Sequence, residues 1–297
     1  MKKETAENEG CSGCTKKDCS AARPRQGEDP REFGERQRLQ SRLCRIGRKV
    51  VVMSGKGGVG KSTMAASLAS ALARAGKRVG LLDIDLHGPS IPTMMGLEGR
   101  RISGPEGEME PIVSRGVKVA SIGMFLEHPD QAVVWRSPMK ANMIRQLLQD
   151  VAWGELDFLV IDSPPGTGDE PLAACQLIGD IDGAVIVTTP QRVAAVDVRK
   201  SITFCRMIEV PVLGVVENMS GFCCPKCGEL TPILGFGGGQ RMAREMGVPF
   251  LGAVPIDPEV VRLGDSGQDA AGQDDSHPAA RAVREVTGQI LRHWERT

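Results

Sequence analysis

The stretch that decides the fold is RKVVVMSGKGGVGKSTMAASLASALARAG, residues 48–76. It begins with a short apolar, β-branched run that ends at Gly55, and it continues through a glycine-rich loop. Small and apolar residues suited to a helix follow and stop at Gly76. The octapeptide GKGGVGKS at 55–62 satisfies the pattern G-x-x-x-x-G-K-[ST] in full, with a strand before it and a helix after it. The chain is therefore expected to bind a nucleoside phosphate.

The glycine-rich loop has the composition of a phosphate cradle. Backbone N–H groups in such a loop point inward and, with the N-terminus of the next helix, solvate phosphate oxygens. Lys61 is expected to reach the β- and γ-phosphates, and Ser62 to offer its hydroxyl to Mg²⁺. Lys56 is not required by an ordinary loop of this kind; it is either a solvated side chain or a charge aimed at a phosphate from another direction. The expected nucleotide contacts are Gly55, Lys56, Gly57, Gly58, Val59, Gly60, Lys61 and Ser62.

Three aspartates stand where predicted strands end. Asp162 ends the run FLVID, and Asp83 and Asp85 end the run LLDID. Because a doubly wound sheet places its ligand at the carboxyl ends of its strands, we expect Asp162 to hold Mg²⁺ through water and Asp83 or Asp85 to orient an attacking water. Asp85 has an alternative role as a helix N-cap, since DLHGPS at 85–90 also has the composition of a turn. The loop SPPGTGDE at 163–170 is typical of a segment that moves with the γ-phosphate.

Apolar runs alternate with helical patterns through most of the chain. Strands that are apolar on both faces and alternate with helices indicate a parallel sheet covered on both sides. The predicted fold class is α/β: a doubly wound, mostly parallel sheet flanked by helices on both faces, as in P-loop NTPases. The expected strands are 48–55, 78–86, 117–124, 156–166, 183–190, 210–219 and 249–255, and the expected helices are 61–76, 138–151, 170–179, 192–207, 238–247 and a closing helix at 279–297.

The chain divides by composition into two parts. Residues 1–47 form a polar N-terminal tail that is expected to be mostly disordered, with a short helix near 31–44. Residues 48–297 form the predicted P-loop NTPase domain. The N-terminus lacks the apolar core of a signal peptide, and no run approaches about 18 apolar residues. We therefore expect a cytoplasmic protein. The tail contains Cys11, Cys14 and Cys19.

Bulk composition argues against two classes of partner. Lysine plus arginine equals aspartate plus glutamate at 37 each, and this balance disfavours a strongly basic nucleic-acid surface. The chain has seven Phe, three Trp and no Tyr, so it offers few rings for base stacking. Neither nucleic acid nor a membrane is an expected partner.

Nine cysteines in a reducing compartment suggest metal ligands, catalytic thiols or buried side chains rather than disulfides. Cys224 and Cys227 form a Cys-Pro-x-Cys step within GFCCPKCGEL at 221–230. An iron–sulfur cubane or a tetrahedral Zn²⁺ needs four ligands, and a two-fold dimer would double the pair. Two alternatives stay open: a structural zinc site, completed by Cys11 and Cys14 or by a second chain, and a thiol redox pair.

Several motifs together resemble one known family. They are KGGVGKS, LLDIDLHGPS, VIDSPPGTGDE, ENMSGFCCPKCG and LGAVPIDPEV, and they are similar to the Mrp/Nbp35 group of iron–sulfur cluster carriers, within the deviant-Walker P-loop ATPases that include MinD and ParA. The resemblance covers about residues 48–295. The resemblance implies that Lys56 reaches the nucleotide of a partner subunit and that Lys61, Ser62 and Thr63 contact phosphates and Mg²⁺. It assigns Asp85 to hydrolysis, Asp162 to the Walker B position and Asn218 to adenine. Cys224 and Cys227 match the pair that holds a cluster at a dimer interface.

The resemblance implies a homodimer that binds ATP and Mg²⁺, hydrolyses ATP slowly, and carries a labile [4Fe–4S] cluster to apo iron–sulfur proteins. The tail departs from the four-cysteine motif of eukaryotic members, so a second cluster there would need Cys44 or an outside ligand. The rival interpretation is a positioning ATPase similar to MinD or ParA with a structural zinc site. Positioning on a membrane or on DNA needs neither Cys224 nor Cys227, so in that interpretation the pair would serve only the zinc site. The closing helix mixes acidic and basic residues on its polar face, so it is expected to pack on its own sheet rather than anchor a membrane.

Overall fold

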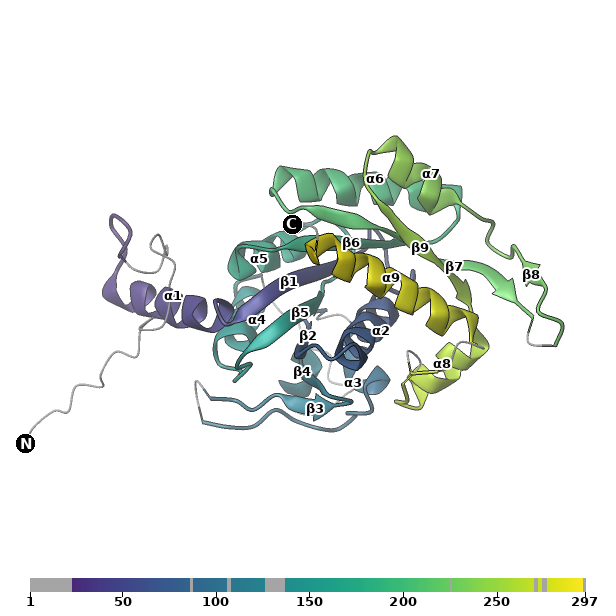
Figure 1. Cartoon of the computed structure of the whole chain (residues 1–297). Coiled ribbons are helices and arrows are strands. Elements are labelled where there is room, and N and C mark those ends of the chain that lie inside the picture. Colours follow the sequence, from purple (N-terminus) through teal and green to yellow (C-terminus); the bar gives the residue numbers. More distant parts are fainter. Residues whose placement is uncertain are drawn as a thin grey trace, which may run out of the picture.

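The computed structural model describes residues 23–85, 88–105, 108–125, 137–224, 226–269, 272–273 and 277–295. The tail cysteines Cys11, Cys14 and Cys19 therefore lie outside the described residues. The described chain builds one nine-stranded sheet with helices on both faces (Figure 1).

The sheet has the order β3-β4-β2-β5-β1-β6-β7-β8, and β9 also pairs with β7. All strand pairs are parallel except β3 with β4 and β7 with β8. The predicted doubly wound, mostly parallel sheet is therefore confirmed. The strands are β1 (Ile46–Met53), β2 (Val79–Asp83), β3 (Ile112–Ser114), β4 (Val117–Ser121), β5 (Leu156–Asp162), β6 (Gly183–Thr188), β7 (Val212–Cys223), β8 (Leu230–Thr231) and β9 (Phe250–Ile256).

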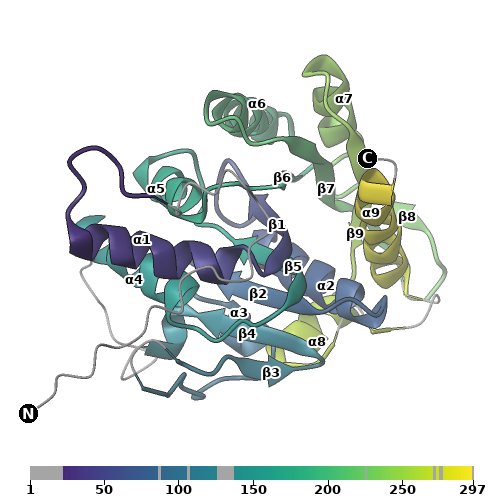
Figure 2. The same ribbon diagram turned by 60° about the vertical axis from the view of Figure 1, so that its left-hand side comes forward.

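Helices cover the sheet in two layers. Helices α2 and α9 pack together on one face, and Figures 1 and 2 place α4, α5, α6 and α7 on the other. The helices are α1 (Pro30–Leu43), α2 (Lys61–Arg74), α3 (Ile91–Met94), α4 (Ser137–Gln149), α5 (Asp169–Ile178), α6 (Arg192–Met207), α7 (Gly238–Glu245), α8 (Pro258–Asp265) and α9 (Pro278–Glu295), with a 3₁₀ turn at Ile122–Phe125.

The closing helix α9 packs against β9 and α2, as its mixed charge predicts. Val283, Val286 and Ile290 are buried there, so the apolar face of α9 is used by the core. Among the described helices, none combines the length and the apolar character needed to cross a bilayer.

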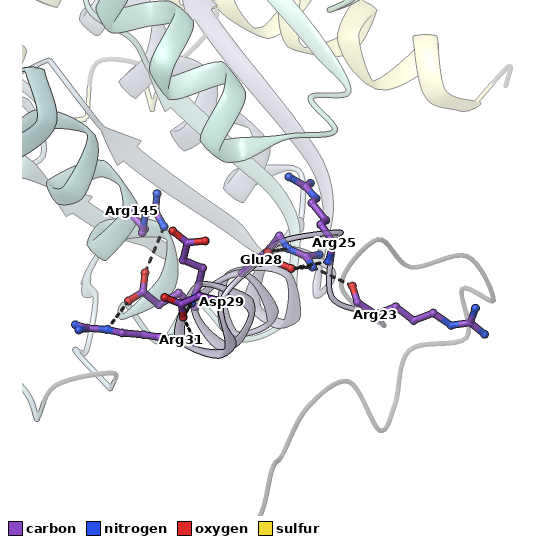
Figure 3. Close-up of polar contacts among 9 residues, drawn as sticks. Arg23, Arg25, Glu28, Asp29, Arg31 and Arg145 are labelled. Carbon is purple, nitrogen blue, oxygen red and sulfur yellow. Dashed lines mark hydrogen bonds and ion pairs between the residues drawn. The ribbon is translucent and has the colours of Figure 1, made fainter.

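Helix α1 lies on α4, outside the main layers (Figure 2). Its first turn is capped by the carboxylate of Asp29, and Glu28 pairs with Arg36 at 2.7 Å between Oε1 and Nε. Arg145 of α4 reaches Glu35 of α1 at 3.5 Å, and Figure 3 shows these polar contacts. The helix expected near 31–44 is therefore present, whereas the division into a tail and a domain stays a prediction.

The structure differs from the sequence prediction mainly at element ends. Strand β1 begins two residues before the predicted start at 48, with Ile46 buried. Strand β7 continues four residues past the predicted end at 219 because β8 pairs with its last two residues, Phe222 and Cys223. The short elements β3, β8, α3 and α8 were not predicted.

Candidate functional site: a phosphate loop and a thiol hairpin

The polar residues of the site gather where the carboxyl ends of three neighbouring strands meet. Strand β1 lies between β5 and β6, and β5 lies between β1 and β2. In this register Asp83 stands beside Asp162, and Val52 stands beside Asp162 from the other side. The phosphate loop leaves β1 at this edge, which is where an open α/β sheet binds its ligand.

Close packing shapes the phosphate loop. Gly60 has φ +80°, and a Cβ there would lie 2.2 Å from Nδ2 of Asn218. That amide nitrogen donates to the carbonyl oxygen of Val59 at 2.9 Å. A Cβ at Gly55 would lie 2.4 Å from Cβ of Asp197 on α6. Glycine is thus required at both ends of the loop, and Asn218 holds the loop from β7.

Lys61 opens helix α2 and points at the aspartates. Its Nζ lies 2.6 Å from Oδ1 of Asp162 and 3.5 Å from Oδ2 of Asp85. The side chain of Lys61 is only 6% exposed and that of Asp162 is fully buried. The charge of the loop lysine is therefore balanced by two strand-end carboxylates.

Asp83 and Asp85 have different surroundings, which separates their roles. Asp83 is fully buried, and its carboxylate accepts from the backbone N–H of Asp85 at 3.0 Å and from the hydroxyl of Ser121 at 2.8 Å. Burial, followed by the charge of Asp162, raises the pKa of Asp83 to about 8. Asp83 therefore holds the backbone of Asp85, and Asp85 is the carboxylate beside Lys61 that can face a ligand.

Asp162 has one oxygen without a partner. Oδ2 is buried and accepts no hydrogen bond from the residues that the structure describes. Burial raises the pKa of Asp162, against the opposing charge of Lys61 and the hydroxyl of Ser62. An unpaired buried carboxylate oxygen beside a hydroxyl suits a hard cation that prefers oxygen ligands, so these residues fit Mg²⁺.

The remaining residues predicted to contact nucleotide lie in the loop before α2 or in the first turn of α2. Gly57 and Gly58 are exposed, and a Cβ at either position would meet no atom within 4 Å. Lys56 is partly buried, and its ammonium makes no ion pair with any described residue. Ser62 and Thr63 are partly buried behind Lys61.

The loop after Asp162 is tied to the phosphate loop by backbone bonds. The N–H of Gly166 donates to the carbonyl of Ser54 at 2.8 Å, and the hydroxyl of Ser54 donates to the carbonyl of Lys56 at 2.9 Å. At the far end of this loop, Glu170 pairs with Lys140 of α4. The segment therefore connects the phosphate loop to α4.

Cys224 and Cys227 lie in a hairpin at the end of β7. We call residues 222–231, which include the last two residues of β7 and all of β8, the thiol hairpin. The N–H of Cys224 donates to the carbonyl of Glu229 at 2.9 Å, and the N–H of Gly228 donates to the carbonyl of Cys224 at 2.8 Å. Figures 1 and 2 show the β7–β8 hairpin at the periphery of the molecule.

The hairpin turn favours the thiolate form of Cys224. Backbone N–H groups of Cys227 and Lys226 lower the pKa of Cys224. A lowered pKa suits a metal ligand, because the thiolate binds the metal. In contrast, burial raises the pKa of Cys175 to about 11 and of Cys205 to about 12, and both thiols lie in the core.

A single chain supplies the hairpin with two ligands. Among the described residues, no set of three or more His, Cys, Asp or Glu is arranged to hold a metal ion. Cys223 directs its sulfur to the carbonyl of Gly228 at 3.6 Å. The thiol pair is therefore an incomplete site within the described part of one chain.

One buried residue near the site was not predicted. Glu217 precedes Asn218 in β7 and is 1% exposed. Its only signal in the sequence is a charge within the otherwise apolar run VPVLGVVENM at 210–219. His87, which follows the LLDID run, lies outside the described residues.

A family model and two related proteins point to the same family. Residues 45–291 match the family described as the NUBPL iron-transfer P-loop NTPase, of ParA type. The iron-sulfur cluster carrier protein of Methanocaldococcus jannaschii is 49% identical over 231 residues, which span 77% of this chain and 80% of that protein. The cytosolic Fe-S cluster assembly factor NUBP2 of Homo sapiens is 48% identical over 247 residues, which span 82% of this chain and 91% of that protein.

Solved structures share the fold. A nucleotide-binding protein of Archaeoglobus fulgidus, determined in complex with ADP and with cobalt, is 44% identical with a TM-score of 0.72, covering 81% of this chain and 94% of that chain. The cell division ATPase MinD of Pyrococcus furiosus is 22% identical with a TM-score of 0.61, covering 83% of this chain and 99% of that chain. The second likeness concerns the fold alone.

Proposed function

This chain belongs to the iron-transfer P-loop NTPase family, and from that membership we propose that it is an ATP-binding iron–sulfur cluster carrier that delivers its cargo to apo-proteins. The family resemblance in the sequence motifs is thereby confirmed. The observation that carries the proposal is the thiol hairpin: a partly exposed Cys224 with a lowered pKa and an exposed Cys227, directly after the strand whose Asn218 contacts the phosphate loop.

The proposed cargo is a [4Fe–4S] cluster held by Cys224 and Cys227 of two copies of the chain. Four thiolates complete such a cluster, and a two-fold axis supplies them as two identical pairs. A cluster that bridges two chains is released when the chains move relative to each other, so the same homodimer suits transfer to apo iron–sulfur proteins.

The proposed reaction at the phosphate loop is slow hydrolysis of ATP. In this proposal Lys61 exchanges its aspartate partners for the β- and γ-phosphates, Asp85 orients the attacking water, and Asn218 contacts adenine. Ser62 and Asp162 would hold Mg²⁺, which neutralises phosphate charge when it is bound. Lys56 is proposed to act on the nucleotide of the partner subunit, since its ammonium has no ion-pair partner among the described residues of its own chain.

We further propose that the protein acts in the cytosol, where its named relative NUBP2 is placed. The division into a polar tail (1–47) and an NTPase domain (48–297) belongs to the same proposal. Metal analysis of the Cys11→Ser variant should find the bridging cluster still in place.

Anaerobic reconstitution tests the proposal. Wild-type protein is expected to take up iron and sulfide and to turn brown, with broad absorbance near about 400 nm. The Cys224→Ser, Cys227→Ser double variant should lose this cluster while it still binds ATP, and Cys223→Ser is the matched control that should keep it. A double variant that binds iron and sulfide at wild-type stoichiometry overturns the proposal. Zinc in place of iron in every wild-type preparation would favour the positioning ATPase with a structural zinc site.

A further inference from the structure

Glu217 is a buried carboxylate with three hydrogen-bond donors. It lies in β7 between β6 and β9 and is 1% exposed. Its Oε1 accepts from the hydroxyl of Ser220 at 2.6 Å and from the N–H of Gly237 at 2.9 Å, and its Oε2 accepts from the N–H of Gly239 at 2.6 Å. Burial of a carboxylate is costly unless its oxygens are hydrogen-bonded, so these contacts account for its presence in the sheet.

The two backbone donors belong to the start of α7, which packs closely against the sheet. A Cβ at Gly238 would lie 2.1 Å from the carbonyl oxygen of Pro190, and a Cβ at Gly239 would lie 3.0 Å from Cγ2 of Thr188. The run of glycines allows the backbone to approach the end of β6 and the carboxylate of Glu217. The start of α7 therefore has a fixed place next to β7.

These hydrogen bonds join the two ends of residues 217–239, which we call the thiol segment because it contains the thiol hairpin; its base is the contact of Glu217 with Gly237 and Gly239. Gly237 is 20 residues beyond Glu217, and the thiol hairpin lies between them. The next residue after Glu217 is Asn218, which donates to the phosphate loop at Val59. Adjacent residues of one strand thus hold the phosphate loop and the base of the thiol segment, on opposite faces of the sheet.

The strand between Glu217 and the hairpin is irregular. Met219 has φ +57° and Gly221 has φ +77°, and the register with β9 shifts between Asn218 and Phe222. A Cβ at Gly221 would lie 2.8 Å from the ring of Phe236. Because the regular ladder is interrupted here, it does not by itself fix the direction in which the hairpin leaves the sheet.

We propose that Glu217 is a positioning residue for the thiol pair. Its carboxylate closes the base of the segment and so sets Cys224 and Cys227 relative to the strand end that holds the phosphate loop. The inference rests on the proposed function, in which the two thiols bind the cluster.

The test compares Glu217→Gln with Glu229→Gln. Glutamine keeps one acceptor oxygen but turns an NH₂ group toward a backbone N–H donor, so at least one of the three bonds is lost. Glu229 lies in the hairpin itself with an exposed side chain, so its variant makes the same change of charge without touching the base. Reduced, cluster-free protein is titrated with Co²⁺ under anaerobic conditions, and thiolate-to-cobalt absorption reports binding; ATP affinity is measured in the same samples.

Glu217→Gln is expected to weaken Co²⁺ binding about tenfold, as the loss of a buried hydrogen bond to a charged group implies, with ATP affinity unchanged. Glu229→Gln should match wild type. Equal Co²⁺ binding by wild type and Glu217→Gln overturns the inference, and so does an equal loss of Co²⁺ and ATP binding, which marks a merely structural role.

Two further variants keep the outcomes separate. If Glu217→Gln does not fold, Ser220→Ala removes one donor only and should weaken Co²⁺ binding about threefold, whereas wild-type affinity in Ser220→Ala counts against the inference. If the Cys224→Ser, Cys227→Ser double variant binds Co²⁺ as wild type does, the proposed function itself fails, whatever Glu217→Gln shows.

Discussion

Replacement of Lys61 by methionine should destabilise the nucleotide-free protein by an amount that depends on pH. The ammonium lies 2.6 Å from Asp162 and 3.5 Å from Asp85, with 6% of the lysine side chain exposed. Lys61→Met leaves Asp162 buried without its countercharge. The removal of one partner from a buried ion pair typically costs about 3–5 kcal/mol.

Protonation of Asp162 sets an upper limit to this cost. Burial already raises the pKa of Asp162 above its ordinary value of 3.8, and the loss of Lys61 raises it further. The folded variant then holds a proton that the unfolded chain releases, so its stability falls as pH rises from about 3.8 toward the folded pKa. At about 1.4 kcal/mol per pH unit, the loss is at most about 4 kcal/mol at pH 7 and about 2 kcal/mol at pH 5.

Urea unfolding at pH 5, 6, 7 and 8 measures this difference. The control is Lys77→Met, because Lys77 is exposed in the turn that follows α2 and its variant should stay within about 0.5 kcal/mol of wild type at every pH. The double variant Lys61→Met, Asp162→Asn should recover much of the loss, since it leaves no unpaired charge at position 162. A loss that is equal at pH 5 and pH 8, together with additive effects in the double variant, would refute the reasoning.

Two other outcomes follow from the same site. Asp83→Asn should make stability less dependent on pH, because a folded pKa of about 8 makes wild type lose stability relative to the variant as pH rises from 5 to 8. Free energies of unfolding that change equally with pH in the two proteins, measured from urea curves, would contradict this. Lys56→Ala should spare ATP binding but reduce hydrolysis. Mixing it with Asp85→Asn should restore part of the ATPase activity, and inactivity at every ratio would argue against action across the dimer.

The phosphate site is predictable from sequence because its parts are contiguous or stand at strand ends. The loop from Gly55 to Lys61 is one motif, and a parallel sheet brings the ends of its neighbouring strands together, which places Asp85 and Asp162 at the same edge. Helix α8 was missed although Asp257 followed by Pro258 is a recognisable start, with the Asp257 carboxylate accepting from the first turn.

The surroundings of the thiols are less predictable for a physical reason. The role proposed for Glu217 depends on its hydrogen bonds with backbone N–H groups 20 and 22 residues away, and no local sequence pattern predicts that contact. The irregularity of β7 includes Met219 at φ +57°, a conformation that methionine rarely adopts and that no sequence pattern predicts. The separate roles of Asp83 and Asp85 also needed the structure, since both end the same run and differ only in burial and partners.

The turn that lowers the pKa of Cys224 has a consequence for chemical lifetime. A thiolate reacts with peroxide and other oxidants faster than a thiol does, and the product can close to a disulfide with a nearby cysteine. Cys227 is exposed and lies three residues beyond Cys224, while Cys175 and Cys205 are buried with raised pKa values and react slowly. In the proposed function a bound cargo would occupy both sulfur atoms, so the interval between release of one cargo and receipt of the next would be when peroxide can reach the thiolate and close the disulfide.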